Sequence, residues 1–303
     1  AQVEAALGIT WLQEIVLDFL EVHGLKQACE RVKASGKRLI VAAPRVFKPG
    51  EERLVRYLLR LQADALLVRS NGLLQHLQSL GGSGGRFDAD TVIPELWGDF
   101  SLNAANVLSM QSLLDSGLSR LTPTHDVNAA QLQALASALP AGQRARVELI
   151  VHHHLPIFHT EYCVFARFLS EGNSYRDCGR PCERHRVHVR DPAGGDHLVL
   201  ADIGCRNTVF NAQAQSAAPY SKALAAAGIR HMRIELVDEP GDQVPGIVQG
   251  YRELLDGHID HQQLWKRLRK VPDANQHPQG VGLGSLAIRA EPSRASMKTP
   301  TAR

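Results

Sequence analysis

The sequence contains no run of about 18 apolar residues, so it lacks the length of apolar chain that a transmembrane helix needs. It also lacks a marked net charge, because 34 Lys and Arg oppose 31 Asp and Glu, for a formal charge of +3. This balance gives no global argument for nucleic-acid binding and leaves room for a local basic face. With 44% hydrophobic and 21% charged residues, the 303-residue chain has the composition of a folded protein. We therefore expect a globular protein without a membrane partner.

Cysteine is scarce and odd in number, with five in the whole chain. This does not suit a secreted domain built on disulfides. Residues 1–20 also lack the basic leader of a signal peptide. We expect a cytoplasmic protein, or an organellar one if the chain, which begins with Ala1, is a processed fragment.

Short apolar runs alternate with helix-like segments along most of the chain. The runs that predict strands are residues 14–20, 38–44, 65–70, 91–103, 119–126, 146–154 and 230–238. Repeated βα units of this kind predict an α/β fold, a parallel sheet covered by helices. Seven strands after an orphan helix predict a TIM-barrel-like (β/α)8 fold that lacks its first strand. A doubly wound open sheet is the alternative, and the absence of G-x-G-x-x-G after any strand disfavours it.

The alternation stops for about 75 residues after the strand predicted at 146–154 and then resumes. We expect one barrel domain over residues 1–271 that includes a cysteine-rich insertion, 156–215, after this late strand. The last segment, 272–303, is rich in Pro, Ser, Gly and Gln. Its composition predicts an extended or disordered tail.

Four of the five cysteines fall in this insertion with the spacing C-x14-C-x3-C-x22-C: Cys163, Cys178, Cys182 and Cys205. Four thiolates suit a [4Fe–4S] cluster, and structural zinc also takes four cysteines. Zinc ribbons present two tight pairs, whereas here only Cys178 and Cys182 form one, so the spacing favours the cluster and zinc is the alternative. Charged, Gly and Pro neighbours argue against core positions for that pair. Cys29, on the apolar face of a predicted helix, is expected in the core.

Histidines crowd the same region. Successive strand residues face opposite sides, so His153 is expected to point away from His152 and His154. Exposed or hydrogen-bonded histidines are the simplest interpretation of this run. His159 and Glu161, just before the first clustered cysteine, are the candidate catalytic residues.

Arginine is dense here as well, with eight Arg, five acidic residues and no Lys between positions 144 and 190. Guanidinium groups bind phosphates and stack on bases, so a basic rim around a metal site would suit RNA. We take Arg180, Arg184 and Arg206 as candidate RNA contacts. The alternative is a network of surface ion pairs with the five carboxylates.

Several motifs together resemble peptidase family U32, the collagenase-like proteases. They are FHTEYCVFARFL (158–169), CGRPCERH (178–185) and LADIGCRNTVFNAQAQSA (200–217), supported by GKRLIVAAPRVFKPGE (36–51), GDFSLNAANVLS (98–109) and QGVGLGSL (279–286). The resemblance covers nearly the whole chain and is greatest to the carboxyl-terminal barrel part of the large, multi-segment members.

The resemblance implies a TIM-barrel-like domain whose iron–sulfur ligands are the four clustered cysteines. Members long labelled peptidases include proteins that support pyrimidine hydroxylation in ribosomal or transfer RNA. The resemblance therefore implies an enzyme, or enzyme subunit, of RNA modification with RNA as its partner. A collagenase-like peptidase is one alternative, and a non-catalytic RNA-binding module with a structural cluster is another. The chain has no G-x-S-x-G and no zinc-protease motif. If all four clustered cysteines bind metal, the cysteine that remains as the nucleophile of a Cys–His protease is Cys29, which we expect to be buried.

Overall fold

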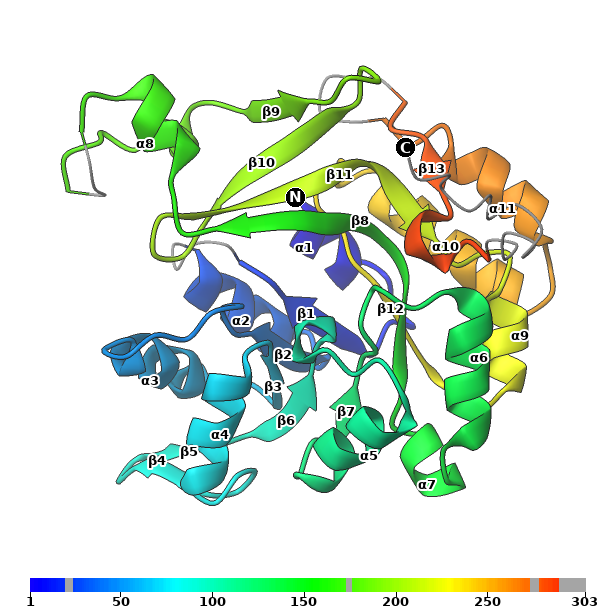
Figure 1. The fold of residues 1–303 in the computed structure, drawn as a ribbon, viewed down its shortest axis with the longest axis horizontal. Helices are drawn as coiled ribbons and strands as arrows, with labels where there is room; N and C mark the ends of the chain where they lie inside the picture. Colours follow the sequence, from blue (N-terminus) through cyan, green and yellow to red (C-terminus); the bar gives the residue numbers. More distant parts are fainter. Residues whose placement is uncertain (20–23, 173–175, 273–277, 289–303) are drawn as a thin grey trace, which may run out of the picture.

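Seven parallel strands form the centre of the molecule, in the order that the sequence predicts (Figure 1). The computed structural model describes residues 1–19, 24–172, 176–272 and 278–288. The strands are β1 (Glu14–Leu17), β2 (Arg38–Ala42), β3 (Ala65–Val68), β6 (Glu95–Gly98), β7 (Arg120–Leu121), β8 (Glu148–Thr160) and β12 (His231–Ile234). The first five pair in parallel as one sheet, and β12 pairs in parallel with β8 in a second. An isolated parallel bridge between Leu121 and Val147 links the two sheets.

The predicted α/β class is confirmed, whereas a closed eight-stranded barrel is not what the described residues form. Among them, β1 pairs with β2 alone and β12 pairs with β8 alone, so these two strands stand at the free ends of the linked sheets. We call the space between the unpaired edges of β1 and β12 the seam. It lies where the sequence predicts that a first strand is lacking.

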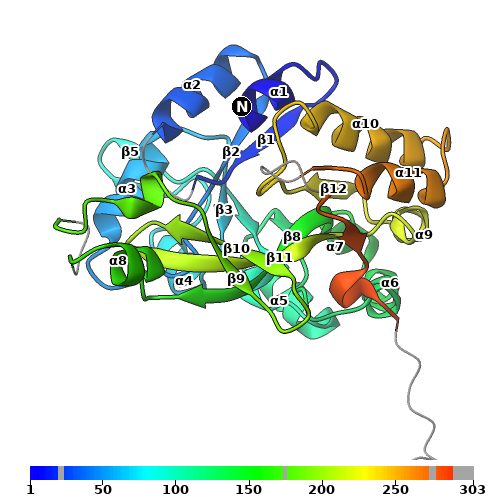
Figure 2. The same cartoon turned by 90° about the horizontal axis from the view of Figure 1, so that it is seen from above.

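Helices lie around the outside of the strands (Figure 2). They are α1 (Gln2–Leu7), α2 (Leu25–Ala34), α3 (Glu52–Arg60), α4 (Asn71–Ser79), α5 (Val107–Asp115), α6 (Ala129–Ala138), α7 (Ala141–Arg144), α9 (Ser221–Ala226), α10 (Val244–Leu255) and α11 (His261–Leu268). Side chains fix several starts. Asn128 caps α6 by accepting from the backbone N–H of Gln131 at 3.0 Å, and Gln131 accepts in return from the Asn128 N–H.

The strands are buried on both faces, as their continuous apolar runs require. All four residues of β3 are buried. Alternate residues face the helices, where they join the main hydrophobic core, while Ile40, Leu67 and Trp97 belong to a smaller cluster on the other face. Most of the core therefore lies between the parallel strands and the helices.

Beyond its parallel part, β8 continues into an antiparallel extension. It pairs with β11 (Arg206–Ser216), which pairs with β10 (Asp196–Asp202) and then β9 (Val187–Arg190). Between β8 and β9 lie α8 (Val164–Leu169) and the short helix η2 (Pro181–Glu183), which project to one side in Figure 1. We call residues 161–186 together with the β10–β11 turn the cysteine segment.

The remaining short elements are β4 (Arg86–Asp88), β5 (Thr91–Val92), η1 (Phe100–Leu102), β13 (Val281–Gly282) and η3 (Gly284–Leu286). β13 pairs with β11, so part of the expected tail, residues 278–288, is folded against the sheet. Residues 289–303 of that tail lie outside the described residues. No helix in the described part of the chain is long and apolar enough to span a membrane.

Candidate functional site

Charged residues follow the carboxyl ends of the parallel strands. Asp18 comes after β1, Arg45 after β2, Arg69 after β3, Asp99 after β6 and Glu235 after β12. The carboxyl ends of parallel strands share one edge, so these side chains meet there, at the position where α/β barrels carry their sites. Sequence reasoning missed all five. The available signal was a charged residue placed at or just beyond the end of an apolar run.

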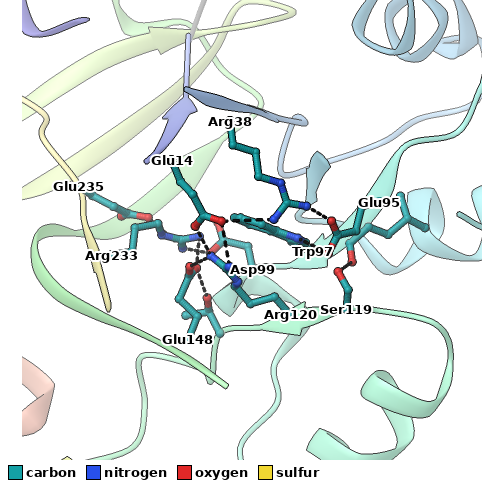
Figure 3. A network of polar contacts seen from close by, with 12 residues as sticks. Glu14, Arg38, Glu95, Trp97, Asp99, Ser119, Arg120, Glu148, Arg233 and Glu235 are labelled. Carbon is teal, nitrogen blue, oxygen red and sulfur yellow. Dashed lines mark hydrogen bonds and ion pairs between the residues drawn. The ribbon is translucent and has the colours of Figure 1, made fainter. Parts of the chain in front are cut away.

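Asp99 is the centre of this group. Its side chain is fully buried, and one oxygen accepts from Nε of Arg69 at 2.8 Å. The guanidinium of Arg233 contacts the other oxygen (Figure 3). Arg69 also donates two hydrogen bonds to the carboxylate of Asp18, at 2.9 and 2.6 Å. Burial alone would raise the pKa of Asp99, but the two arginines hold it well below its usual range. The charges at this edge therefore stabilise one another.

The same network runs through the interior to the other end of the strands. Arg233 contacts Glu148 at 2.7 Å, and Arg120 lies 3.2 Å from Glu148 and 2.7 Å from Glu14 (Figure 3). The Arg120 guanidinium stacks on the ring of Trp97, 3.7 Å from its centroid. The space that apolar side chains fill in many barrels is here occupied largely by paired charges.

Arg45 differs from the other arginines at this edge. Its guanidinium lies between the rings of Phe100 and Phe210, 5.4 and 5.9 Å from their centroids. It makes no hydrogen bond or ion pair with any described residue, and it lines a cavity of about 780 Å³. A partly buried guanidinium without an acidic partner is suited to an anionic or acceptor group of a ligand.

A pair of histidines whose rings are in contact at a tilt adjoins the charged group. The rings of His125 and His153 lie 4.5 Å apart, and His125 stacks on Phe100 at 3.8 Å. Burial lowers the pKa of both rings, which favours neutral imidazoles. The amide of Gln215 donates to Nε2 of His153 at 3.1 Å, while Nε2 of His125 is buried without a partner among the described residues.

The alternation expected for the histidine run is confirmed. His152 and His154 both contact Glu239, at 3.2 and 3.4 Å, while His153 points to the opposite side of β8. All three are buried. Burial opposes protonation of His154, but its hydrogen bond to Glu239 outweighs this and raises the pKa of the ring. These histidines are hydrogen-bonded within the core.

His159, a candidate catalytic residue, lies on the extension near the carboxyl ends. Its Nδ1 is 3.0 Å from Oγ1 of Thr208 and 3.9 Å from Asp202. Burial lowers the pKa of the ring, and Nε2 is buried with no partner in the described part of the chain. The unsatisfied nitrogen keeps His159 available as a donor or acceptor.

Glu161 and Arg206 pair with each other at 2.8 Å. Glu161 also contacts Lys48, and Arg206 reaches Glu51 at 2.6 Å. Although burial opposes it, these cations lower the pKa of Glu161, so it is held as a paired carboxylate. The Arg206 side chain is only 2% exposed. The expected RNA contact of Arg206 is therefore not supported, because its charge joins β11 to the segment after β2.

The structure places the four clustered cysteines within the cysteine segment. Cys163 caps α8, where its Sγ accepts from the N–H of Ala166 at 3.5 Å. Cys178 precedes η2, Cys182 lies within it, and Cys205 lies in the β10–β11 turn. All four are partly exposed and none forms a disulfide. Their number and chemistry fit an iron–sulfur cluster or zinc.

The four thiols are not assembled into a ligand group. Within residues 1–19, 24–172, 176–272 and 278–288, no three His, Cys, Asp or Glu side chains converge on a point that could hold a metal ion. Cys29 stands apart from them in the core, 2% exposed as expected, and burial raises the pKa of its thiol to about 11. It is therefore a poor candidate for a nucleophile.

Two turns of the cysteine segment adopt left-handed backbone conformations. Gly204 and Cys205 have φ of 83° and 60°, and Gly179 and Arg180 have φ of 65° and 49°. Glycine tolerates this region, whereas a residue with a Cβ loses about 1–2 kcal/mol there. Such outliers concentrate at functional sites. Cys205 therefore occupies a position at which its side chain carries a conformational cost.

The arginines of the cysteine segment and β9 make local contacts. Arg180 pairs with Glu183 at 3.1 Å, and Arg184 donates to the carbonyl of Gly179 at 3.0 Å. Arg190 donates two hydrogen bonds to the carboxylate of Asp196. Arg180 and Arg184 remain exposed. The surface ion pairs that the sequence offered as an alternative thus account for part of the arginine density.

The family model described as peptidase family U32 matches residues 17–279, from the last residue of β1 to a position just before β13. No curated protein and no solved structure gives a significant match. The match spans the parallel strands from β2 to β12, the charged group at the carboxyl ends of the strands and all four clustered cysteines.

Proposed function

The chain belongs to peptidase family U32, and we propose that it is an iron–sulfur protein that modifies RNA, as an enzyme or subunit of pyrimidine hydroxylation in ribosomal or transfer RNA. The observation that carries the proposal is the set of four partly exposed cysteines in one segment, in a chain whose fifth cysteine is buried. Cys163, Cys178, Cys182 and Cys205 would hold a [4Fe–4S] cluster, which supplies redox chemistry when bound.

The backbone at Cys205 supports a ligand role. A cysteine in the left-handed region costs more than a glycine there, and such a cost is retained where the side chain has a task. Gly179 and Arg180 place a similar turn between Cys178 and Cys182. Both turns redirect the chain sharply beside a thiol.

The reacting part of the substrate would lie at the carboxyl ends of the strands. Arg45, flanked by two phenylalanine rings, would take an anionic or acceptor group of the substrate there. His159 is the candidate to hold or move a proton, because its Nε2 is unsatisfied. Glu161 would act as a positioning residue through its ion pairs.

RNA binding tests the proposal. Arg180→Ala and Arg184→Ala should each weaken binding of structured RNA and reduce the slope of log affinity against log salt by about 0.7 to 0.9 for each phosphate that the variant no longer neutralises. Arg53→Ala, an exposed arginine on α3, is the matched control and should leave affinity and slope unchanged. Thermal stability is recorded alongside. Lower stability with an unchanged salt slope would mean that the two arginines serve only the local contacts described above.

Peptide cleavage is the outcome that would replace this proposal. Among the described residues, no serine hydroxyl hydrogen-bonds to a histidine ring, and Cys29 is buried with a raised pKa. We therefore expect no digestion of gelatin or casein by the purified protein. Digestion that disappears in Cys163→Ala and persists in Cys29→Ala would assign a peptidase in place of an RNA-modifying protein.

A further inference from the structure

The carboxyl-terminal motif QGVGLGSL, residues 279–286, contacts a glutamine on β11. The motif forms β13 and η3, and Ser285 of η3 donates from its backbone N–H to Oε1 of Gln215 at 2.7 Å. The Ser285 hydroxyl donates to the same oxygen at 3.1 Å. A backbone N–H can only donate, so this bond fixes which end of the Gln215 amide is the oxygen. The NH2 group of the amide therefore faces the other way.

The NH2 group of Gln215 determines which nitrogen of His153 carries the proton. It donates to Nε2 of His153 at 3.1 Å, and a ring nitrogen that accepts a hydrogen bond is not protonated. The His153 side chain is buried, which lowers the pKa of the ring and favours its neutral form. In a neutral imidazole the proton then lies on Nδ1. Gln215 and Ser285 thus set the tautomer of His153.

The Nδ1 atom of His153 lies beside the carboxylate of Glu235, directly after β12. It is 3.7 Å from Oε2, which is longer than a hydrogen bond, and it is buried without a hydrogen-bond partner in the described part of the chain. The other oxygen of Glu235 lies 3.0 Å from the Arg233 guanidinium (Figure 3). Although burial opposes it, Arg233 lowers the pKa of Glu235. Glu235 is thus an ionised carboxylate, and its Oε2 has capacity for a further donor.

Glu235 lines the same cavity as Arg45, whereas His153 lies behind it. The Glu235 side chain is 24% exposed and that of His153 only 1%. A ligand in the cavity can therefore contact Glu235 directly, and His153 acts on the ligand through Glu235. Arg45 offers donors to such a ligand, and Glu235 offers an acceptor.

We propose that Glu235 accepts a hydrogen bond from an N–H or O–H group of the substrate, and that His153, held as its Nδ1–H tautomer by Gln215, is its positioning residue. The N–H of His153 orients the carboxylate and favours its charged form. The distance of 3.7 Å fits this role, because hydrogen bonds of a site are often long before the substrate binds. The inference rests on the proposed function for the place of the substrate. It assigns a task to the QGVGLGSL motif, which fixes the Gln215 amide.

The tautomer is tested by NMR of protein labelled with 15N in its histidines, in which two-bond couplings separate protonated from bare ring nitrogens. We expect a protonated Nδ1 and a bare Nε2 for His153, whose signals are identified by their loss in His153→Gln. Gln215→Glu keeps the shape of the side chain and replaces the NH2 donor with an acceptor, so it should protonate Nε2. Gln213→Glu, an exposed position on the same strand, is the matched control and should leave His153 unchanged.

The acceptor role is tested with the structured RNA used for the arginine variants. Glu235→Gln removes a negative charge, which by itself would strengthen RNA binding. Because the substrate donor loses a charged acceptor, we instead expect binding to weaken about tenfold or more. Glu30→Gln, at an exposed carboxylate on α2, is the control and should leave affinity within about twofold. Urea unfolding checks that each variant is folded.

A protonated Nε2 in the unmodified protein, or an unchanged tautomer in folded Gln215→Glu, would overturn the positioning role. Unchanged or stronger RNA binding by folded Glu235→Gln would overturn the acceptor role. Absence of RNA binding by the unmodified protein would overturn the proposed function and the acceptor role together. The histidine signals require neither RNA nor the cluster, so they decide the positioning role of His153 separately.

Discussion

Replacing Asp99 with Asn is expected to lower the free energy of unfolding by about 3–5 kcal/mol, because it leaves buried arginine charge without its carboxylate. Asp99 is fully buried and accepts from Nε of Arg69, from the guanidinium of Arg233 and from the N–H of Phe100. Each charge-assisted bond contributes about 1.5–3 kcal/mol. The asparagine amide keeps one acceptor oxygen and turns its NH2 toward the other guanidinium, so one charge-assisted bond is replaced by a contact between two donors and the negative charge is lost.

Urea unfolding monitored by tryptophan fluorescence measures this loss, with the dependence on urea expected to stay unchanged. Asp90→Asn, at an exposed carboxylate, is the control and should change stability by less than about 0.5 kcal/mol. Combining Asp99→Asn with Arg233→Met should cost less than the sum of the two single changes, because the two side chains interact. A loss below about 1 kcal/mol for Asp99→Asn would refute the view that paired charges hold the strands together.

Three further results follow from the structure. Because the folded-state pKa of His125 is lowered by burial, the unfolded chain binds the extra proton, so stability should fall as pH drops below about 6.5. In urea titrations His125→Gln should weaken this fall by up to about 1.4 kcal/mol per pH unit, and exposed His188→Gln should not. Tyr251→Phe removes a buried hydroxyl that donates to a β8 carbonyl at 2.8 Å and should cost about 1–3 kcal/mol in urea unfolding, whereas Tyr57→Phe should cost almost nothing. In metal-free protein Cys205→Gly should be about 1 kcal/mol more stable than Cys205→Ala, since glycine accepts a φ of 60° without a Cβ penalty; a more stable alanine variant would contradict the strain at this turn.

The parallel strands were predictable because a strand that is buried on both faces has apolar residues at consecutive positions in the sequence. The run at 65–70 became β3, Ala65–Val68, with all four residues buried. The strand expected over 119–126 shrank to Arg120–Leu121, because the next residues leave the ladder and Pro123 has no N–H to donate. The continuation of β8 to Thr160 was missed, since its pairing depends on β11, about 50 residues away.

The charged interior could not be predicted from sequence. A charged residue within or beside a strand indicates a solvent-facing position unless its partner is known, and the partners here lie far apart. Asp99 and Arg233, for example, are 134 residues apart and meet only when the strands gather around one centre. The buried position of Arg206 was missed for the same reason, because Glu51 is 155 residues away. The cysteines and the family were recognisable because their signal is local spacing.

The iron and sulfide content of anaerobically purified protein tests most directly whether the clustered cysteines hold an iron–sulfur cluster. We expect broad absorbance near about 400 nm and roughly four irons with as many sulfides per chain. Cys182→Ala should lose the iron, whereas Cys29→Ala, which changes a buried core thiol, should keep it. Stoichiometric zinc without sulfide, or equal loss of iron in both variants, would contradict the claim.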